Sequence, residues 1–230
     1  NAAAASPTLR DGAGSERDVL DWLSRFGVPA SPSIVTRSAD AAVAHARTLG
    51  GAVVLKIVSP DIAHKTEVGG VRLRLQGDAQ IAAAWHEIDA NVRQAAPQAR
   101  IDGILVAPMR EGGVELFVGS ARDPDWGRVI VAGLGGIWVE VLKDSALRVL
   151  PVQRADVLEM LQGLRAAKIL QGYRGSPAVD LEAVADVVVK IGAAALALPE
   201  RAAALEINPL WVKGSQVEAL DALVTWDARP

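Results

Sequence analysis

Two oxygen-bearing side chains near the carboxyl end have a spacing that suits a divalent cation. If the strand around Glu206 turns back through Gly214-Ser215, Asn208 faces Asp221 with about 5 Å between their Cβ atoms. A carboxamide oxygen and a carboxylate hold Mg²⁺ when phosphate oxygens and water complete its octahedron. Glu206 falls on the same face as Asn208, because side chains alternate along a strand. Pro209 cannot donate to a ladder, so we expect an irregular strand there, and the alternative is an Asn-Pro turn beside a surface aspartate.

A lysine interrupts an apolar, β-branched run of strand length. Lys56 lies within Val53–Val58, where an unpaired ammonium would cost several kcal/mol or more if it were buried. Lys56 therefore requires an anion, and a phosphate would satisfy it. The alternative is a lysine on an edge strand that prevents sheet-to-sheet association, and the sequence favours neither interpretation.

The loop 59–70 combines a histidine, a lysine and two adjacent glycines. Backbone amides near paired glycines can approach phosphate oxygens, and Lys65 adds positive charge. His64 offers a neutral nucleophile near pH 7. Taken alone, the loop is better explained as a solvated hairpin tip, because most loop histidines have no chemical role.

A second glycine-rich segment, 133–136, follows an apolar run. No Lys-Ser or Lys-Thr follows it, so it is not a Walker motif, and the next residues are more strand-like than helical, which excludes a dinucleotide fingerprint. A tight turn is the favoured interpretation unless other phosphate ligands converge on it.

The elements that must position these residues follow from hydrophobic periodicity and from capping signals. Ser15 and Gly27 delimit the first helix. Helices are predicted at about 15–26, 39–49, 81–92, 155–164 and 180–198. Strands are predicted at 52–58, 71–75, 101–107, 114–119, 128–132, 137–142, 204–207, 211–212 and 216–220. The strands 52–58 and 71–75 should form a hairpin, and strict alternation in 71–75 predicts one buried face. Because helices and strands do not alternate strictly, the fold class is α+β.

Composition narrows the function classes. The 230 residues are 50% hydrophobic and carry 24 Lys+Arg against 27 Asp+Glu, a net charge of -3, which excludes a disordered chain and argues against nucleic-acid binding. Cysteine is absent, which removes disulfides and thiolate metal sites. No apolar run approaches the roughly 20 residues of a membrane span. Residues 1–14 are interpreted as a flexible tail or linker, so we expect a fragment of a longer fused protein.

Several short motifs then follow one another in order: V-V-L-K at 53–56, S-P-D-I-A-H-K-T-E-V-G-G-V at 59–71, G-I-L-V-A-P-M at 103–109, R-D-P-D-W-G at 122–127, G-L-G-G-I-W-V-E at 133–140, R-G at 174–175 and E-I-N-P-L at 206–210. As an ordered set they resemble the ATP-grasp portion of the NDP-forming acyl-CoA synthetases. The resemblance is closest to the beta subunit of ADP-forming acetyl-CoA synthetase and more distant to succinyl-CoA synthetase. It runs from about residue 15 to the end.

The resemblance implies an ATP-grasp fold at 15–230, with ATP or ADP and Mg²⁺ held between two α+β lobes. The smaller lobe would cover roughly 35–108 and the larger lobe roughly 109–230. It implies Mg²⁺ ligands at Asn208 and Asp221, which agrees with the hairpin spacing. Residues implied to bind the nucleotide are Lys56 at the α- and β-phosphates, Lys65 in the loop, Val106, Ala107 and Met109 at the adenine hinge, Glu115 near the ribose, and Gly135 and Gly136.

In the family, a phosphoryl group moves from ATP to histidine and then to an acyl carboxylate, before CoA displaces phosphate. The resemblance implies that His64 is a second phosphoryl carrier and that Glu206 holds the incoming imidazole. The relay histidine and the CoA site belong to a separate half, so we expect a CoA-binding phosphohistidine domain or subunit as partner. A homo- or hetero-oligomer, a cytoplasmic location and no nucleic-acid or membrane partner are also expected.

Two alternatives stay open. One is an ATP-grasp carboxylate-amine ligase, which would not need His64, and the other is a nucleotide-sensing regulatory module. The chain also departs from the family pattern at two positions, where Trp126 replaces a usual Phe and Arg128 a frequent Pro. These departures affect local packing more than chemistry.

Overall fold

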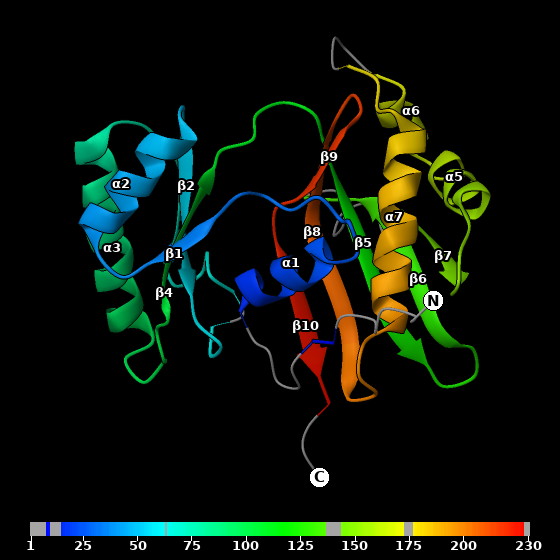
Figure 1. Cartoon of the computed structure of the whole chain (residues 1–230), viewed down its shortest axis with the longest axis horizontal. Coiled ribbons are helices and arrows are strands. Elements are labelled where there is room, and N and C mark those ends of the chain that lie inside the picture. The colour runs from blue at the N-terminus through cyan, green and yellow to red at the C-terminus, as the bar shows by residue number, and fades with distance from the viewer. Residues whose placement is uncertain (1–7, 10–14, 63, 137–143, 173–176, 228–230) are drawn as a thin grey trace, which may run out of the picture. The chain divides into compact units, whose positions relative to one another are not determined.

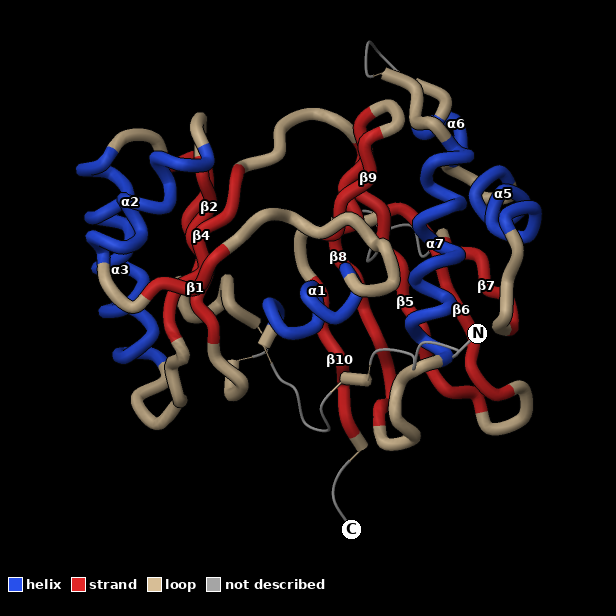
Figure 2. Tube along the Cα trace, viewed as in Figure 1, coloured by secondary structure: helices blue, strands red, loops and turns tan. Residues whose placement is uncertain are grey.

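The computed structural model describes residues 8–9, 15–62, 64–136, 144–172 and 177–227. Within them the chain forms two compact units, Ser31–Glu111 and a larger one made of Asn1–Ala30 and Gly112–Pro230. Each unit combines helices with an antiparallel sheet (Figure 2), which is the α+β architecture expected from the sequence. The lobe boundaries at 35–108 and 109–230 stay predictions.

The smaller unit is a four-stranded sheet, in the order β1-β4-β2-β3, covered by two helices (Figure 1). Its elements are β1 (Ile34–Thr36), α2 (Ala39–Leu49), β2 (Val53–Val58), β3 (Val71–Leu75), α3 (Asp78–Ala95) and β4 (Gly103–Pro108). Ser38 caps α2 by accepting the N–H of Ala41, and Ala42 and Ala46 of α2 are buried at helical spacing. The helices share a core with Leu55 and Ile57 of β2, so these two residues face the helices.

Lys56 therefore lies on the sheet face away from the helices, between two residues that point toward them. Val54, Val58 and Leu105 form a separate apolar cluster on this second face. The sheet order places β2 between β4 and β3, which excludes the edge-strand explanation of Lys56. Lys56 is half-buried, as expected for a cation that reaches out of an apolar surface.

The hairpin of β2 and β3 is confirmed, but the predicted buried face of 71–75 is wrong. Leu73 is 52% exposed, and the pairing of β2 with β3 shifts register between Val53 and Leu55. Arg74 has φ 56°, in the left-handed region that side chains rarely adopt. An irregular residue in the strand breaks the alternation on which the expectation depended.

The larger unit carries a six-stranded sheet in the order β10-β8-β5-β6-β7, with β9 paired to β8. Its helices are α1 (Glu16–Ser24), α5 (Arg154–Gln162), α6 (Ala167–Leu170) and α7 (Leu181–Leu196). Its strands are β5 (Val114–Asp123), β6 (Gly127–Leu134), β7 (Ser145–Val149), β8 (Ala202–Lys213), β9 (Gln216–Ala219) and β10 (Ala222–Trp226). Figure 1 shows α1 and α7 on the same side of this sheet.

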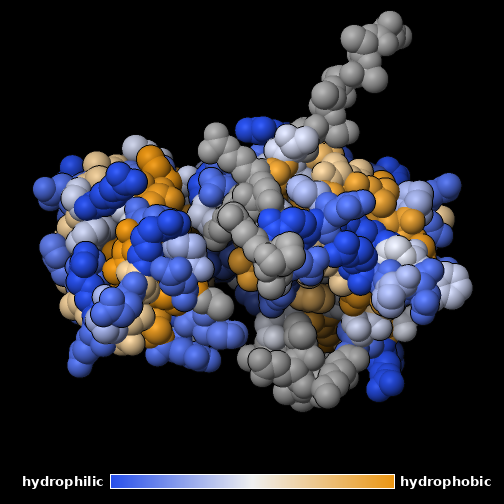
Figure 3. Space-filling model, turned by 90° about the horizontal axis from the view of Figure 1, so that it is seen from below, coloured by the Kyte–Doolittle hydropathy of each residue, from blue (hydrophilic) through white to orange (hydrophobic). Residues whose placement is uncertain are grey.

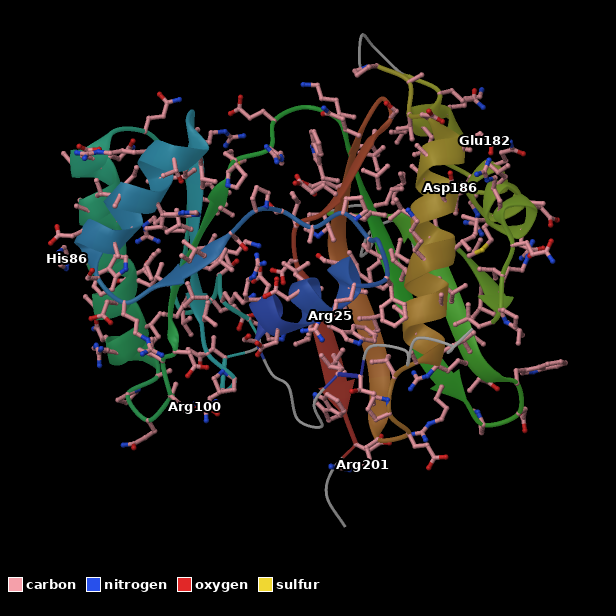
Figure 4. The ribbon with its side chains drawn as sticks, viewed as in Figure 1. Arg25, His86, Arg100, Glu182, Asp186 and Arg201 are labelled. Atoms are coloured by element: carbon pink, nitrogen blue, oxygen red, sulfur yellow. The ribbon has the colours of Figure 1, made fainter. Side chains whose placement is uncertain are left out.

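The core of the larger unit forms where these helices meet the sheet. Val184, Val188 and Ile191 of α7 are fully buried at helical spacing, together with Leu205 and Ile207 of β8. Across the outside of the helices, Arg154 of α5 pairs with Glu182 at 3.4 Å and also with Asp186, one turn apart on α7 (Figure 4).

Several predicted elements differ in extent. The segments 204–207 and 211–212 belong to one long strand, β8, and Gly133 belongs to β6 and not to a turn. The sequence did not predict β1, β7, α6 or β10. The predicted strand 137–142 and the Arg174-Gly175 motif lie outside the described residues. Of residues 1–14 only 8–9 are described, and Leu9 is buried in the larger core.

Among the described residues, none of the helices combines the length and the apolar character that crossing a bilayer requires. Hydrophilic and apolar residues are interspersed on the face drawn in Figure 3.

Trp126 is 70% exposed at the turn between β5 and β6, and Arg128 donates to the carbonyl of Ala202 at 2.7 Å. Both departures from the family pattern are thus accommodated without disturbing the β5–β6 pairing.

The N-terminal cap of α7 gives a test of this packing. Asp180 accepts the N–H groups of Glu182 and Ala183, each at 3.1 Å. We expect Asp180→Ala to lower the free energy of unfolding by about 0.5–2 kcal/mol, because two helix N–H groups lose their acceptor. Urea denaturation followed by circular dichroism measures the change. Asp180→Asn keeps an acceptor and is the control, and equal stability of the Ala variant and the unmodified chain would contradict the assignment.

Candidate active site

The hairpin at the carboxyl end has the register that the sequence predicts. The N–H of Asn208 donates to the carbonyl of Asp221 at 3.2 Å, and the N–H of Leu220 donates to the carbonyl of Pro209 at 3.0 Å. The same register continues on both sides, in the pairing of β8 with β9 and with β10. The prediction that Asn208 faces Asp221 is therefore confirmed.

The irregularity expected at Pro209 is a β-bulge toward the other neighbour of β8. The pairing of β8 with β5 shifts between Leu116 and Val118, so that Asn208 and Pro209 together oppose Phe117. Such a bulge bends a strand and re-aims a side chain. In β8 the bulge separates the residues up to Ile207, which pair with β5 in one register, from those after Pro209, which pair in another.

The oxygen groups of β8 lie on the face of the sheet away from the helices. Leu205 and Ile207 point into the core, whereas Glu206 and Asn208 are exposed and alternate with them. Asp221 is half-buried in the connection between β9 and β10. The structure thus brings together Glu206, Asn208 and Asp221 at one part of the open face.

This donor set suits a hard cation such as Mg²⁺ that takes part of its coordination from another molecule. In the described ranges, His, Cys, Asp and Glu form no group of three or more that would hold a metal. Asn208 and Asp221 alone would supply one carboxamide and one carboxylate. A magnesium ion at this pair would need oxygen ligands from a bound phosphate and from water.

Glu115 and the paired glycines also lie together in the larger unit. The N–H of Gly135 donates to the carbonyl of Glu115 at 2.7 Å, so the pairing of β6 with β5 continues past the end of β6. A methyl group at Gly135 would lie 2.8 Å from the carbonyl carbon of Leu116, and one at Gly136 would lie 2.9 Å from Oε2 of Glu115. The close approach of backbone to backbone explains why glycine occupies position 135.

Two aromatic residues beside these groups were not singled out from the sequence. Phe117 is half-buried opposite the bulge, and Trp211 pairs with Glu115 across β8 and β5. The indole Nε1 of Trp211 donates to the carbonyl of Gly112 at 2.6 Å. Period-two alternation from Glu115 would have placed Phe117 on the same face, but the position of Trp211 depends on a bulge that periodicity does not reveal.

The proposed hinge residues of the smaller unit differ in orientation. Val106 is fully buried and belongs to the core under the helices, so its side chain is not accessible to a ligand. Ala107 lies on the other face, in the cluster beside Lys56. The N–H of Met109 donates to the carbonyl of Ala52 at 2.8 Å, on the β2 side of the chain.

This hydrogen bond fixes which backbone groups point away from β2. In an antiparallel ladder, consecutive residues direct their N–H and C=O groups to opposite sides. Since the N–H of Met109 points toward β2, the carbonyl of Pro108, which belongs to the same trans peptide, points the other way. Sequence alternation could have indicated Pro108 once the pairing of Met109 was known.

The loop that carries His64 is folded into successive turns. The N–H of Glu67 donates to the carbonyl of His64 at 3.2 Å, and the N–H of Gly70 to the carbonyl of Lys65 at 2.8 Å. His64 is exposed and Lys65 is half-buried, while Ala63 lies outside the described residues. These internal hydrogen bonds fold the loop on itself, so it is not a simple solvated hairpin tip.

The other two histidines lie on helices. His45 is on α2 and His86 on α3 (Figure 4 labels His86), and both helices cover the face of the sheet opposite to Lys56. Burial lowers the pKa of His45, which favours its neutral form. His64 lies instead in the loop that joins β2 to β3.

Known proteins match this chain along most of its length. A family model described as an ATP-grasp domain matches residues 10–225. The beta subunit of ADP-forming acetate–CoA ligase I from Pyrococcus furiosus is 39% identical over 207 residues, which cover 90% of this chain and 89% of that subunit. ADP-forming acetate–CoA ligase I from Archaeoglobus fulgidus is 40% identical over 202 residues, 88% of this chain, but the match covers 29% of that protein.

Solved structures share the fold along almost the whole chain. The dinucleotide-forming acetyl-coenzyme A synthetase 1 of Ca. Korarchaeum cryptofilum, in complex with coenzyme A, Ca-AMPCP and HgCl+, gives a TM-score of 0.89 at 35% identity and covers 93% of both chains. A second structure of that enzyme, with coenzyme A and Mg-AMPPCP, has its phosphohistidine segment pointing towards the nucleotide binding site. Its TM-score is 0.80 at 32% identity, with 94% of each chain covered.

Proposed function

Because the chain belongs to the ATP-grasp domain family, we propose that it is the nucleotide-binding part of an ADP-forming acyl-CoA synthetase. The observation that carries the proposal is the pairing of Asn208 with Asp221, which holds two hard oxygen donors at one part of the open sheet face. The synthetase of Ca. Korarchaeum cryptofilum that contains a similar chain was solved in complex with coenzyme A and Ca-AMPCP. The proposed substrate is ATP with Mg²⁺.

In the smaller unit, Lys56 would bind the α- and β-phosphates. Its place inside a β-branched strand holds the ammonium on the face away from the helices, where a phosphate would neutralise it. The hinge residues would bind the adenine through the backbone, since Val106 is buried among the helices. The carbonyl of Pro108, which points away from β2, would accept a hydrogen bond from the adenine edge.

In the larger unit, Asn208 and Asp221 would hold Mg²⁺, which would neutralise charge on the transferring phosphoryl group. Glu115 would lie near the ribose. The backbone of Gly135 and Gly136, which lies against Leu116 and Glu115, would bind the nucleotide beside it. Of these residues, Glu115, Gly136 and Asn208 are exposed, which supports their proposed contact with a ligand.

His64 would accept the phosphoryl group. Its unprotonated ring nitrogen forms the N–P bond while the bond from the γ-phosphorus to the bridging oxygen breaks, and ADP leaves with the electron pair. Glu206, an exposed carboxylate of the larger unit, would hold an incoming imidazole through the proton on the ring nitrogen that does not attack. A carboxylate in that position fixes the tautomer that leaves the attacking nitrogen free.

The completion of the reaction needs a second half that binds coenzyme A. The chain spans 29% of the Archaeoglobus fulgidus relative but 89% of the Pyrococcus furiosus beta subunit, so the same domain occurs within longer chains and as a subunit. We infer a partner domain or subunit that carries coenzyme A and a phosphohistidine. A cytoplasmic location and the oligomeric state stay predictions.

The metal pair gives the first test. We expect Asn208→Ala and Asp221→Ala each to slow Mg²⁺-dependent phosphoryl transfer at least about 100-fold, because loss of a ligand should exceed the effect of an outer-shell change. Transfer is measured as label from ATP radiolabelled at the γ-phosphorus, with the CoA-binding half present. Glu200→Gln, an exposed acidic residue just before β8, is the control. Normal transfer in both Ala variants, with circular dichroism unchanged, would reject the metal assignment.

The histidine gives the second test, which also separates the alternatives. We expect His64→Ala to lose acid-labile phosphate on this chain and to keep its affinity for ATP, because the nucleotide contacts assigned above do not include this ring. His86→Ala, a change of the exposed histidine on α3, is the matched control. Label and turnover at normal levels in His64→Ala would contradict the carrier role and favour a ligase that forms the acyl phosphate directly. ATP binding without any phosphohistidine in the unmodified chain would favour a nucleotide sensor.

A further inference from the structure

His64 lies in a long connection between two paired strands, so something must hold it in place. The connection runs from the end of β2 at Val58 to the start of β3 at Val71. An attack on phosphorus requires the nucleophile in line, and a misplacement of about 1 Å can cost about 100-fold in rate. An exposed side chain in a loop of this length would not keep such a position without anchors in the backbone.

One anchor lies shortly before the histidine. The carboxylate Oδ2 of Asp61 accepts the backbone N–H of Arg100 at 2.7 Å, and the N–H of Asp61 donates to Oγ of Ser59 at 3.1 Å. A hydrogen bond from a backbone N–H to an ionised carboxylate is stronger than one between neutral groups. It joins the loop to a segment that is distant in the sequence and enters β4.

The contact continues the pairing of β2 with β4 beyond the ends of the strands. Val58 pairs with Gly103, and its carbonyl accepts the N–H of Asp102 at 2.9 Å. The Asp61–Arg100 hydrogen bond follows next, at the end of the smaller unit where β4 begins (Figure 4 labels Arg100). Ile62, the next residue after Asp61, is buried in the core under the helices. The chain is thus fixed two residues before His64.

The second anchor lies after the histidine. The N–H of Ile57 donates to the carbonyl of Gly70 at 2.8 Å, and the N–H of Gly70 donates to the carbonyl of Lys65. A methyl group at position 70 would lie 2.6 Å from Cγ2 of Ile57 and 2.8 Å from the carbonyl oxygen of Lys65. The loop therefore closes onto β2 only because residue 70 is glycine.

From these contacts we propose that Asp61 is a positioning residue for His64, through its hydrogen bond to the backbone of Arg100. The inference rests on the phosphoryl-carrier role proposed for His64. Asp61 does not touch the reacting atoms; it holds the first half of the loop against the chain that enters β4. Its carboxylate acts as a hydrogen-bond acceptor, so an uncharged acceptor of the same shape should replace it.

The test compares Asp61→Ala with Asp61→Asn in the chain assembled with its CoA-binding half. We expect Asp61→Ala to slow the labelling of His64 by about 10- to 100-fold while the KM for ATP stays unchanged, because the loop shifts and the nucleotide contacts do not. Asp61→Asn should restore most of the rate, since its carboxamide oxygen accepts the same N–H. Asp102→Ala is the matched control, because Asp102 pairs with the side chain of Arg100 at 3.3 Å and not with its backbone.

Each outcome is decisive. Normal labelling in Asp61→Ala overturns the inference, and so does an Asp61→Asn variant as slow as Asp61→Ala, because charge and not the hydrogen bond would then matter. If Asp61→Ala does not fold, Asp61→Asn decides alone: retained labelling supports the inference and lost labelling overturns it. Absence of label on His64 in the unmodified enzyme would instead reject the proposed function, and amide exchange at Arg100, faster in Asp61→Ala than in Asp61→Asn, would still report the anchor.

Discussion

The pairing of β8 with the two strands that follow it is the constraint on which the rest of the site depends. One register runs through β9 and β10, so Asn208 and Asp221 are held opposite each other by backbone hydrogen bonds and not by their side chains. The register alone therefore sets which two residues stand opposite each other. On the other side of β8, the bulge opposite Phe117 lets a strand that contains Pro209 stay within the sheet. A slip of one residue would turn Asn208 toward the core and place Ile207 on the open face.

In the smaller unit, the sheet sets the positions of a cation, Lys56, and of the loop that carries His64. Two helices occupy one face of its sheet, so the alternation of β2 sends Leu55 and Ile57 into the core and Lys56 to the opposite side. The same sheet anchors the loop of His64 at both ends, through Asp61 and Gly70. In each unit, then, backbone pairing in the sheet sets the positions of the residues to which the proposed function assigns chemistry.

The sequence predicted those parts of the fold that local patterns determine. Ser15 caps α1 as its position indicates, α2 spans the predicted 39–49, and the return at Gly214-Ser215 correctly set the partner of Asn208. It did not predict short strands such as β1, because three residues carry too little periodicity. It also misjudged Leu73, and it did not indicate that the side chain of Val106 points into the core. The exposure of Leu73 follows a register shift, and the burial of Val106 depends on which face the helices cover, so both are properties of the tertiary structure. Family resemblance, and not local pattern, pointed to His64 and Glu206.

The claim that matters most is that Asn208 and Asp221 share one metal ion with the nucleotide. A crystal of the chain with Mn²⁺ and a non-hydrolysable ATP analogue tests it directly, because manganese replaces magnesium at oxygen sites and can be located by anomalous scattering. We expect one manganese peak within bonding distance of the Asn208 carboxamide oxygen, the Asp221 carboxylate and phosphate oxygens of the analogue. A peak bound to the phosphates while either side chain points elsewhere would contradict the metal site and leave only the family membership standing.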